Sequence, residues 1–256
     1  MLPTIWEQTK ILTKTIPSKL AVIITAAGSS TRIGGGIKKE YLPYKNGTVL
    51  SACASVFFKA DYKKLNLDLA CLVVTYPEGG LEKCREALCS DEELKSAAFQ
   101  SKLIFAKGRE SRQASVFSGL QAAKESCPDL DYVLIHDGAR PFLSSSLVLE
   151  LADAAQRYGA AVPGLTPTDT QKEINKDGFI ERHLVRQNLV AVQTPQGFKF
   201  AALFEAHLKA EELAKKSHRE FTDDTEIWGE FCGAVKVIPG SPENIKITYP
   251  SDLEKL

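Results

Sequence analysis

A run of β-branched residues that breaks off into very small ones limits the folds open to this chain. Val22–Ile24 indicates a buried strand. Ala26–Gly28 follows at once, and residues this small let another group approach the main chain closely. The hydroxyl and N–H groups of Ser29–Thr31 suit phosphate oxygens, and Arg32 and Lys39 then supply positive charge. The segment therefore predicts a strand that leads into an anion-binding loop.

Strand-like and helix-like segments alternate along the chain. Strands are predicted at 20–26, 69–75, 102–106, 132–136, 160–164 and 234–238, and helices at 48–60, 79–89, 111–125, 145–158, 199–215, 223–231 and 250–256. This alternation predicts an α/β, Rossmann-like fold with a mainly parallel twisted sheet and helices on both faces. Ligands of such sheets bind beyond the carboxyl ends of the strands.

Hydroxyl side chains stand where several of these helices should begin. Thr48 and Ser111 are predicted N-caps. Ser251 and Glu254 have the spacing of a capping box at the start of the last helix.

One polar segment, Thr166–Asn188, interrupts the alternation. A turn signal at Asn175–Gly178 lies between two short alternating runs and predicts a β-hairpin. A two-stranded arm is marginally stable alone, so we expect it to pack on a second subunit. The predicted organisation is an N-terminal extension at 1–18 and a single domain at 19–256, with a dimerisation arm at about 166–188.

Composition excludes several classes of partner. Lys plus Arg equals Asp plus Glu, at 32 each, so no global field draws the protein to nucleic acid or an anionic membrane. No apolar run approaches the roughly 20 residues that a membrane span needs. Residues 1–18 lack the apolar region of a signal peptide. The six cysteines include no C-x-x-C pair, which favours buried free thiols in a reducing cytoplasm over a zinc site.

The glycine loop matches neither common nucleotide fingerprint. Gly28 is followed by Ser-Ser-Thr-Arg, so the loop is neither G-x-G-x-x-G nor G-x-x-x-x-G-K-[ST]. A nicotinamide-dependent oxidoreductase is therefore disfavoured.

A second cluster follows the predicted strand 132–136. Asp137 stands at the strand's carboxyl end, where a carboxylate either holds a magnesium ion or a ribose hydroxyl, or only caps the turn. Arg140 is either a phosphate ligand or part of a salt bridge that fixes the loop. His136 is interpreted as structural.

Further clusters lie at the ends of other predicted elements. Gly108–Val116 joins a strand to a helix, and helix N-termini attract anions. The others are Thr194–Phe198, Thr222–Asp224 and Glu243–Thr248. Each basic residue alone reads as a surface charge, but their joint occurrence indicates an anion site.

Seven blocks in this order resemble a known family. They are AAGSSTRIGGGIKKEYL, GRESRQASV, HDGARPF, Thr168–Thr170, Arg186 with TPQGF after seven residues, TDD and ENIKIT. Together they cover nearly the whole chain, from residue 21 to 253, and closely resemble the 2-C-methyl-D-erythritol 4-phosphate cytidylyltransferases of non-mevalonate isoprenoid synthesis.

The resemblance implies a reaction and an assembly. The reaction is transfer of CMP from CTP to methylerythritol phosphate, with release of pyrophosphate, by in-line attack of the acceptor phosphate on the α-phosphate. The resemblance also implies the nucleotide-diphospho-sugar transferase version of the fold, Mg2+ as cofactor and a cytoplasmic homodimer with an exchanged arm. Its partners would be CTP and a polyol phosphate, without nucleic acid or membrane.

Site residues are carried over position by position. The resemblance implies that Arg32 and Lys39 stabilise the transition state, while Arg186 and Lys246 position the acceptor phosphate. It implies metal ligands at Asp137 and Glu243. It further implies nucleotide- or substrate-binding positions at Ala26, Ala27, Gly28, Gly108, Arg112, Ser115, Asp137, Gly138, Arg140, Thr170, Thr194 and Thr222.

Four departures from the family pattern affect these expectations. Arg109 stands where a second glycine is common, and Val185 stands where the family often has aspartate. Lys38 stands where the family usually has proline, so the loop is expected to be more mobile. Glu243 replaces a usual aspartate and adds one methylene group.

Two alternatives stay open. Ribitol-5-phosphate cytidylyltransferase has the same fold and donor, and the arm is the region to compare. A catalytically silent nucleotide-binding regulator is the other, although Arg32 and Lys39 are both retained.

Overall fold

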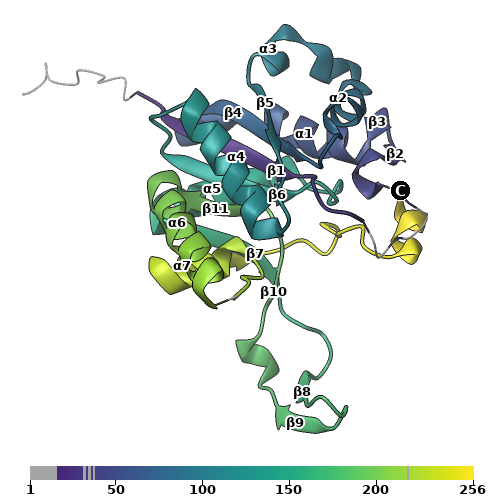
Figure 1. Ribbon diagram of the computed structural model, residues 1–256, viewed down its shortest axis with the longest axis vertical. Helices are drawn as coiled ribbons and strands as arrows, with labels where there is room; N and C mark the ends of the chain where they lie inside the picture. The colour runs from purple at the N-terminus through teal and green to yellow at the C-terminus, as the bar shows by residue number, and fades with distance from the viewer. Residues whose placement is uncertain (1–15, 31–32, 34–35, 37, 218) are drawn as a thin grey trace, which may run out of the picture.

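The computed structural model describes residues 16–30, 33, 36, 38–217 and 219–256. The predictions for Arg32 and for residues 1–15 of the N-terminal extension lie outside the described residues. Figure 1 shows a sheet sandwiched between helices, with a long arm projecting from the body.

An eight-stranded sheet forms the centre. Its order is β10-β7-β11-β6-β1-β4-β5, and the eighth strand, β12, also pairs with β7. β1, β4, β5 and β6 are parallel to one another, and β12 is parallel to β7. The expected mainly parallel sheet is thus confirmed. The strand bounds are β1 (Ser18–Thr25), β4 (Leu67–Tyr76), β5 (Leu103–Lys107), β6 (Tyr132–Asp137), β7 (Ala160–Leu165), β10 (Ala191–Val192), β11 (Gln196–Lys199) and β12 (Lys236–Pro239).

Two short strands, β10 and β11, run the other way, and β10 pairs antiparallel with β7. β11, which the sequence pattern did not predict, pairs antiparallel with both β6 and β7. Its first residue, Gln196, lies opposite Ile135, close to the carboxyl end of β6. Thr194 and Gln196 therefore lie at the same edge of the sheet as the ends of the parallel strands.

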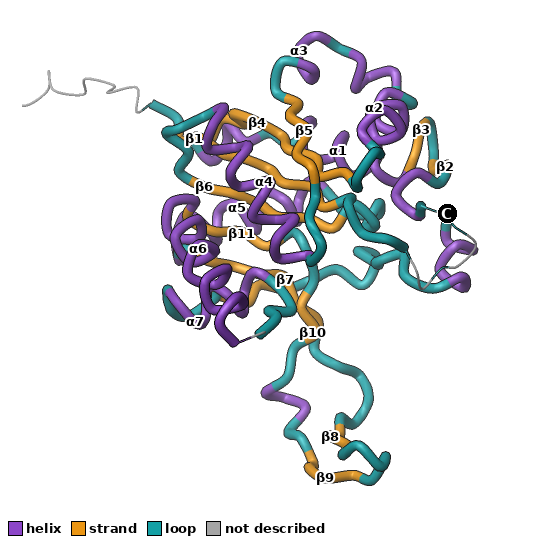
Figure 2. Tube along the Cα trace, viewed as in Figure 1, coloured by secondary structure: helices purple, strands orange, loops and turns teal. Residues whose placement is uncertain are grey.

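Helices cover both faces of the sheet, as expected. Val22 and Ile24 of β1 belong to the apolar cluster that contains α1 (Val49–Lys59), α2 (Leu81–Cys89) and α5 (Ser145–Tyr158). Ala21 and Ile23 belong to the cluster of the other face, with α4 (Arg112–Ser126), α6 (Phe200–Ser217) and α7 (Asp224–Phe231). This alternation is what a strand buried on both faces requires. Figure 2 shows α4 and α6 in front of the sheet.

The remaining short elements connect this framework. A small hairpin joins β2 (Pro43–Tyr44) to β3 (Gly47–Thr48). The helix α3 (Ala97–Gln100) has a single turn. The described 3-10 helices are η2 (Lys39–Tyr41), η3 (Tyr62–Leu65), η4 (Glu92–Lys95), η5 (Arg186–Asn188) and η6 (Pro250–Lys255).

Helix capping follows the sequence in two cases and departs from it in one. The Thr48 and Ser111 hydroxyls accept the N–H groups of the third helical residues, as expected. The capping box expected between Ser251 and Glu254 is wrong. Instead, the Asp252 carboxylate accepts two backbone N–H groups at 2.9 Å each, from Thr248 and Tyr249, and the segment is a 3-10 helix rather than an α-helix.

The arm contains the expected hairpin. β8 (Lys172–Ile174) pairs antiparallel with β9 (Ile180–His183). In the turn, Asn175 Oδ1 accepts the N–H groups of Asp177 and Phe179, and Gly178 has a φ of 85° that suits glycine. Four large apolar side chains are exposed on the arm: Ile174, Phe179, Ile180 and Val185, at 62%, 71%, 55% and 61%.

Two further sequence expectations concern the burial of the cysteines and the absence of a membrane-spanning helix. All six cysteines carry free thiols, but only Cys53, Cys71 and Cys84 are buried, whereas Cys232 is exposed. In the part of the chain that the structure describes, no helix combines the length and the apolar character that crossing a bilayer requires.

Candidate active site

A cavity of about 410 Å³ opens at the carboxyl ends of β1 and β6. Its walls come from five parts of the chain that lie far apart in sequence. They are the glycine loop at 27–30, Lys39 and Glu40 of η2, the loop and first turn of α4 at 109–112, the segment 137–139, and Lys246 with Thr248. The cavity lies where ligands of parallel α/β sheets bind.

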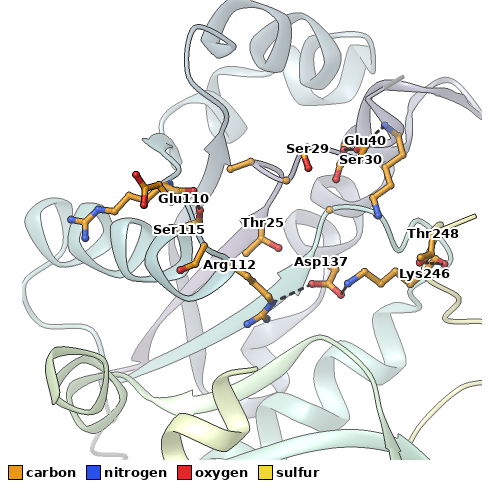
Figure 3. Close-up of a pocket in the computed structure, with 17 residues that line it drawn as sticks. Thr25, Ser29, Ser30, Glu40, Glu110, Arg112, Ser115, Asp137, Lys246 and Thr248 are labelled. Carbon is orange, nitrogen blue, oxygen red and sulfur yellow. Dashed lines mark hydrogen bonds and ion pairs between the residues drawn. The ribbon is translucent and has the colours of Figure 1, made fainter. Parts of the chain in front are cut away.

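Three cations surround the Asp137 carboxylate. Lys246 Nζ lies 2.8 Å from Oδ2, Arg140 Nε 3.4 Å from Oδ2, and Arg112 Nε 3.9 Å from Oδ1. Burial opposes ionisation of Asp137, but these cations hold its pKa below the ordinary value. Figure 3 shows Arg112 and Lys246 approaching Asp137 from opposite sides. The cavity floor is therefore an ionised carboxylate within an excess of positive charge.

The glycine loop is fastened to η2. Ser30, at a φ of 55°, donates its hydroxyl to Glu40 Oε2 over 3.2 Å. Lys38 Nζ lies 3.4 Å from the same carboxylate oxygen and also donates to the Gly28 carbonyl. Lys38 thus adds two contacts where a proline would make none. This arrangement places the next residue, Lys39, on the cavity wall.

Arg140 lies behind the cavity wall. Its Nη1 donates to the Asn244 carbonyl over 2.8 Å, while Nε faces Asp137, and its side chain is only 12% exposed. Of the two roles left open by the sequence, the geometry favours the salt bridge that fixes the loop.

His136 is held in one neutral form by its neighbours. The Asp137 N–H donates to Thr194 Oγ1 over 3.0 Å, which leaves the Thr194 hydroxyl hydrogen for His136 Nδ1 at 3.2 Å. Nε2–H then donates to the Arg140 carbonyl over 3.3 Å. Complete burial lowers the pKa of His136 to about 4. The structural interpretation of His136 agrees with these contacts.

The opposite wall is built by the loop before α4. The Gly108 N–H donates to the Tyr76 carbonyl over 2.8 Å, and the Arg109 N–H donates to Ser115 Oγ over 3.0 Å. A β-carbon on Gly108 would lie 2.2 Å from the β-carbon of Ala27. The loops after β1 and β5 therefore approach as closely as glycine permits.

The segment 246–248 near the C-terminus forms one wall of the cavity. The Ile247 N–H donates to the Ala139 carbonyl over 2.8 Å. Ile33, Ala139 and Ile247 form a small buried cluster, against which Leu253 and Leu256 pack. This contact places Lys246 beside Asp137.

Comparison with known proteins gives this site a family. The profile of IspD, 2-C-methyl-D-erythritol 4-phosphate cytidylyltransferase, matches residues 20–255. The chain belongs to this family. The 2-C-methyl-D-erythritol 4-phosphate cytidylyltransferase of Clostridium novyi is 36% identical over 92% of this chain and 94% of its own length. That of Geobacillus thermodenitrificans is 35% identical over 90% and 92%.

Solved structures agree with the fold. The 2-C-methyl-D-erythritol 4-phosphate cytidylyltransferase of Thermus thermophilus aligns with a TM-score of 0.68 at 32% identity, over 93% of this chain and 96% of that one. The 4-diphosphocytidyl-2C-methyl-D-erythritol synthase of Anaerococcus prevotii aligns with a TM-score of 0.75 at 25% identity, over 93% and 94%.

The structure brings together many of the positions that the IspD family pattern marks. Those that line the cavity are Ala27, Gly28, Lys39, Arg112, Ser115, Asp137, Gly138 and Lys246. Ala26, Gly108, Arg140 and Thr194 are not among the lining residues but are bonded to or packed beside them. Arg32 lies outside the described residues.

Other marked positions lie away from this cavity. Thr170 and Arg186 belong to the arm, where Arg186 donates to the Thr168 carbonyl. Thr222 precedes α7 and bonds Glu226 through both its N–H and its hydroxyl. Glu243 lines a separate surface cavity with Tyr44 and Phe142, so this chain does not bring it beside Asp137.

Several residues that carry the site were not marked by the sequence. Glu40 and Thr248 line the cavity, and Glu40 accepts the hydroxyl of Ser30, for which the sequence instead predicted phosphate oxygens as partners. Asp224 pairs with Arg112 from behind, with Nη1 and Oδ2 2.9 Å apart. The only signal for Asp224 was its place in the TDD block, in which Thr222 alone received a role.

Proposed function

We propose that this chain transfers CMP from CTP to the phosphate of 2-C-methyl-D-erythritol 4-phosphate. The observation that carries the proposal is the convergence of Lys39, Arg112 and Lys246 on one cavity behind a glycine loop. A triphosphate and a phosphate monoester repel each other, and fixed cations remove that obstacle.

The proposed reaction needs no strong general base. A phosphate monoester is largely ionised near neutral pH, so its own oxygen serves as nucleophile. That oxygen forms a bond to the α-phosphorus of CTP while the bond to the bridging oxygen breaks, and pyrophosphate leaves with the electron pair. Lys39 would stabilise the charge that develops on the transferring group, and Lys246 would position the acceptor phosphate.

Mg2+ fits the site through Asp137. Among the residues that the structure describes, no cluster of three or more His, Cys, Asp or Glu side chains could hold a metal by itself. Mg2+ is commonly bound by only one or two carboxylates together with substrate phosphates, and Asp137 supplies one ionised carboxylate in the cavity. The ion would neutralise phosphate charge when bound. Glu243 lines a separate cavity, so Asp137 is the carboxylate to which we assign the ion.

The arm supports a homodimer. Thr170 and Arg186 do not line the cavity of their own chain, and the arm exposes Ile174, Phe179 and Ile180. We therefore assign these two polar residues to the acceptor site of a partner chain. The free thiols favour the reducing cytoplasm as the place of action.

The test is a pyrophosphate-release assay with CTP, UTP and ATP against two acceptors, 2-C-methyl-D-erythritol 4-phosphate and ribitol 5-phosphate. We expect release only with CTP and much faster release with the methylerythritol acceptor. Faster release with ribitol 5-phosphate would establish the alternative acceptor. CTP binding without release under any condition would establish a silent regulator.

A further inference from the structure

A chain of alternating charges runs from the cavity into the core. Arg112 opens α4, and its guanidinium lies between two carboxylates: Asp224 Oδ2 at 2.9 Å from Nη1 and Asp137 Oδ1 at 3.9 Å from Nε. Arg112 lines the cavity, whereas Asp224 does not. The carboxylate closest to Arg112 therefore belongs to Asp224, which does not line the cavity.

Asp224 is fixed by three different elements. Its backbone N–H donates to Gln196 Oε1 over 3.2 Å, while Gln196 Nε2 donates to Asp223 Oδ2 over 2.8 Å. Its Oδ1 lies 3.0 Å from His207 Nε2 of α6. The His207 ring stacks on Phe117 with centroids 5.9 Å apart. The carboxylate position is thus set by α6, β11 and the first turn of α7.

Arg112 balances the charge of this carboxylate. The Asp224 side chain is fully buried, and its Oδ2 accepts no hydrogen bond within the described part of the chain apart from the ion pair. Burial alone would favour the neutral acid, yet Arg112 and His207 hold the pKa of Asp224 below its ordinary value. The attraction acts on both partners, so Asp224 also draws the Arg112 guanidinium away from the cavity centre.

Removing that attraction would change the cavity. Asp137 already has Lys246 at 2.8 Å and Arg140 at 3.4 Å. Without Asp224, Asp137, 3.9 Å away, is the remaining ion-pair partner of Arg112 among the described residues. Asp223 also attracts Arg112, but its carboxylate is held by Gln196, Thr225 and the Glu226 N–H. Arg112 would then close on Asp137 and block the carboxylate that the nucleotide needs.

We propose that Asp224 is a positioning residue that holds Arg112 away from Asp137 and so keeps the nucleotide cavity open. Gln196 supports this role because it fixes the α7 turn that carries Asp224. The inference rests on the proposed use of CTP. It explains why residues of the TPQGF and TDD blocks bond each other behind the site.

The test is CTP binding by calorimetry combined with steady-state kinetics. Asp224→Asn keeps the size of the side chain and removes its charge. We expect the Kd for CTP to rise about tenfold, while kcat at saturating substrates and the KM of the acceptor stay within about threefold. Asp153→Asn is the matched control, because Asp153 pairs with Arg157 on the surface of α5. It should leave all three constants unchanged.

A double-mutant cycle separates positioning from a general structural effect. If Asp224 acts through Arg112, then Asp224→Asn should weaken CTP binding no further in an Arg112→Gln background. Equal and additive losses in both backgrounds, or a wild-type Kd in Asp224→Asn, would overturn the inference. Absence of CTP binding by the unmodified protein would instead overturn the proposed function.

A second variant decides the matter if Asp224→Asn does not fold. Gln196→Met removes both hydrogen bonds to the α7 turn but retains the Asp224 charge. We expect a rise of about threefold in the Kd for CTP that disappears in the Arg112→Gln background. An unchanged Kd, or a rise that persists there, would contradict the positioning role.

Discussion

Two adjacent lysines, Lys38 and Lys39, perform different tasks at the end of the glycine loop. Lys38 Nζ binds the Gly28 carbonyl and Glu40, so its charge is used within the protein. Lys39 lines the cavity. Sequence alone ranked Lys39 by its resemblance to a family position, but only the structure shows why its neighbour cannot replace it.

Lys39→Ala should therefore lower kcat by about two to three powers of ten, since one well-placed cation is lost from the transition state. The Kd for CTP should change much less, and the far-ultraviolet circular dichroism should not change. Lys38→Ala is the comparison variant and should alter the KM for CTP more than kcat. A Lys39→Ala enzyme with nearly normal kcat would exclude Lys39 from the chemistry.

His136 makes stability depend on pH. Its pKa is lowered from 6.5 to about 4 in the folded state, so the unfolded chain binds more protons between these values. The contribution is therefore fully present above about pH 6.5 and is lost as the pH falls toward 4, by up to about 3 kcal/mol.

Urea unfolding of wild type and His136→Gln from pH 7 to pH 4 measures this contribution. The free energy of unfolding of the wild type should fall more steeply across that range. Parallel curves for the two proteins would show that His136 does not carry the dependence.

Among the secondary-structure elements, the alternation of apolar runs with amphipathic segments predicted every parallel strand and every long helix. The signal was strong because both faces of the sheet are covered, so the strands are continuous apolar runs. β11 was missed because its four residues, Gln196–Lys199, include a glycine and two polar residues. Its pairing depends on β6 and β7 rather than on its own composition.

The site was predictable in part for the same reason. Loops at the carboxyl ends of strands, such as 26–28 and 137–138, could be placed from the order of elements. Asp224 could not, because its partner Arg112 lies 112 residues earlier and nothing local predicts that the two helix N-termini meet. Gln196 could not be predicted as part of the site either, because its partners Asp223 and Asp224 also lie far away in the sequence.

Close approach of two loops gives a prediction about Gly108. In Gly108→Ala, the new β-carbon would lie 2.2 Å from that of Ala27, so one loop must move. We expect the KM for CTP to rise about tenfold while the fold is kept, because both loops border the cavity. Gly229→Ala is a suitable control, since nothing lies within 4 Å of the added group. A normal KM would show that the loops separate freely.

At the scale of the whole molecule, we propose that the arm completes the active site of a partner chain. If Arg186 acts in the partner's cavity, a mixture of inactive Lys39→Ala and Arg186→Ala chains should regain activity. Random exchange should restore about a quarter of wild-type turnover, because half of the dimers are mixed and one site in each is complete.

The matched control mixes Lys39→Ala with Lys246→Ala. Both residues line the cavity of their own chain, so no mixed dimer holds an intact site and turnover should stay low. Absence of recovery in the first mixture would mean that sites are not shared between chains, whereas recovery in the control would mean that Lys39 and Lys246 of one chain do not serve the same site. Pyrophosphate release after subunit exchange measures both outcomes.

The packing of Leu253 and Leu256 beneath Ile33 has a practical consequence for handling the protein. Leu253 and Leu256 support the cluster that contains Ile247, the residue after Lys246, so a purification tag or a fused reporter attached after Leu256 would disturb that packing. Substitutions that loosen this packing would therefore lower activity without replacing any residue of the cavity.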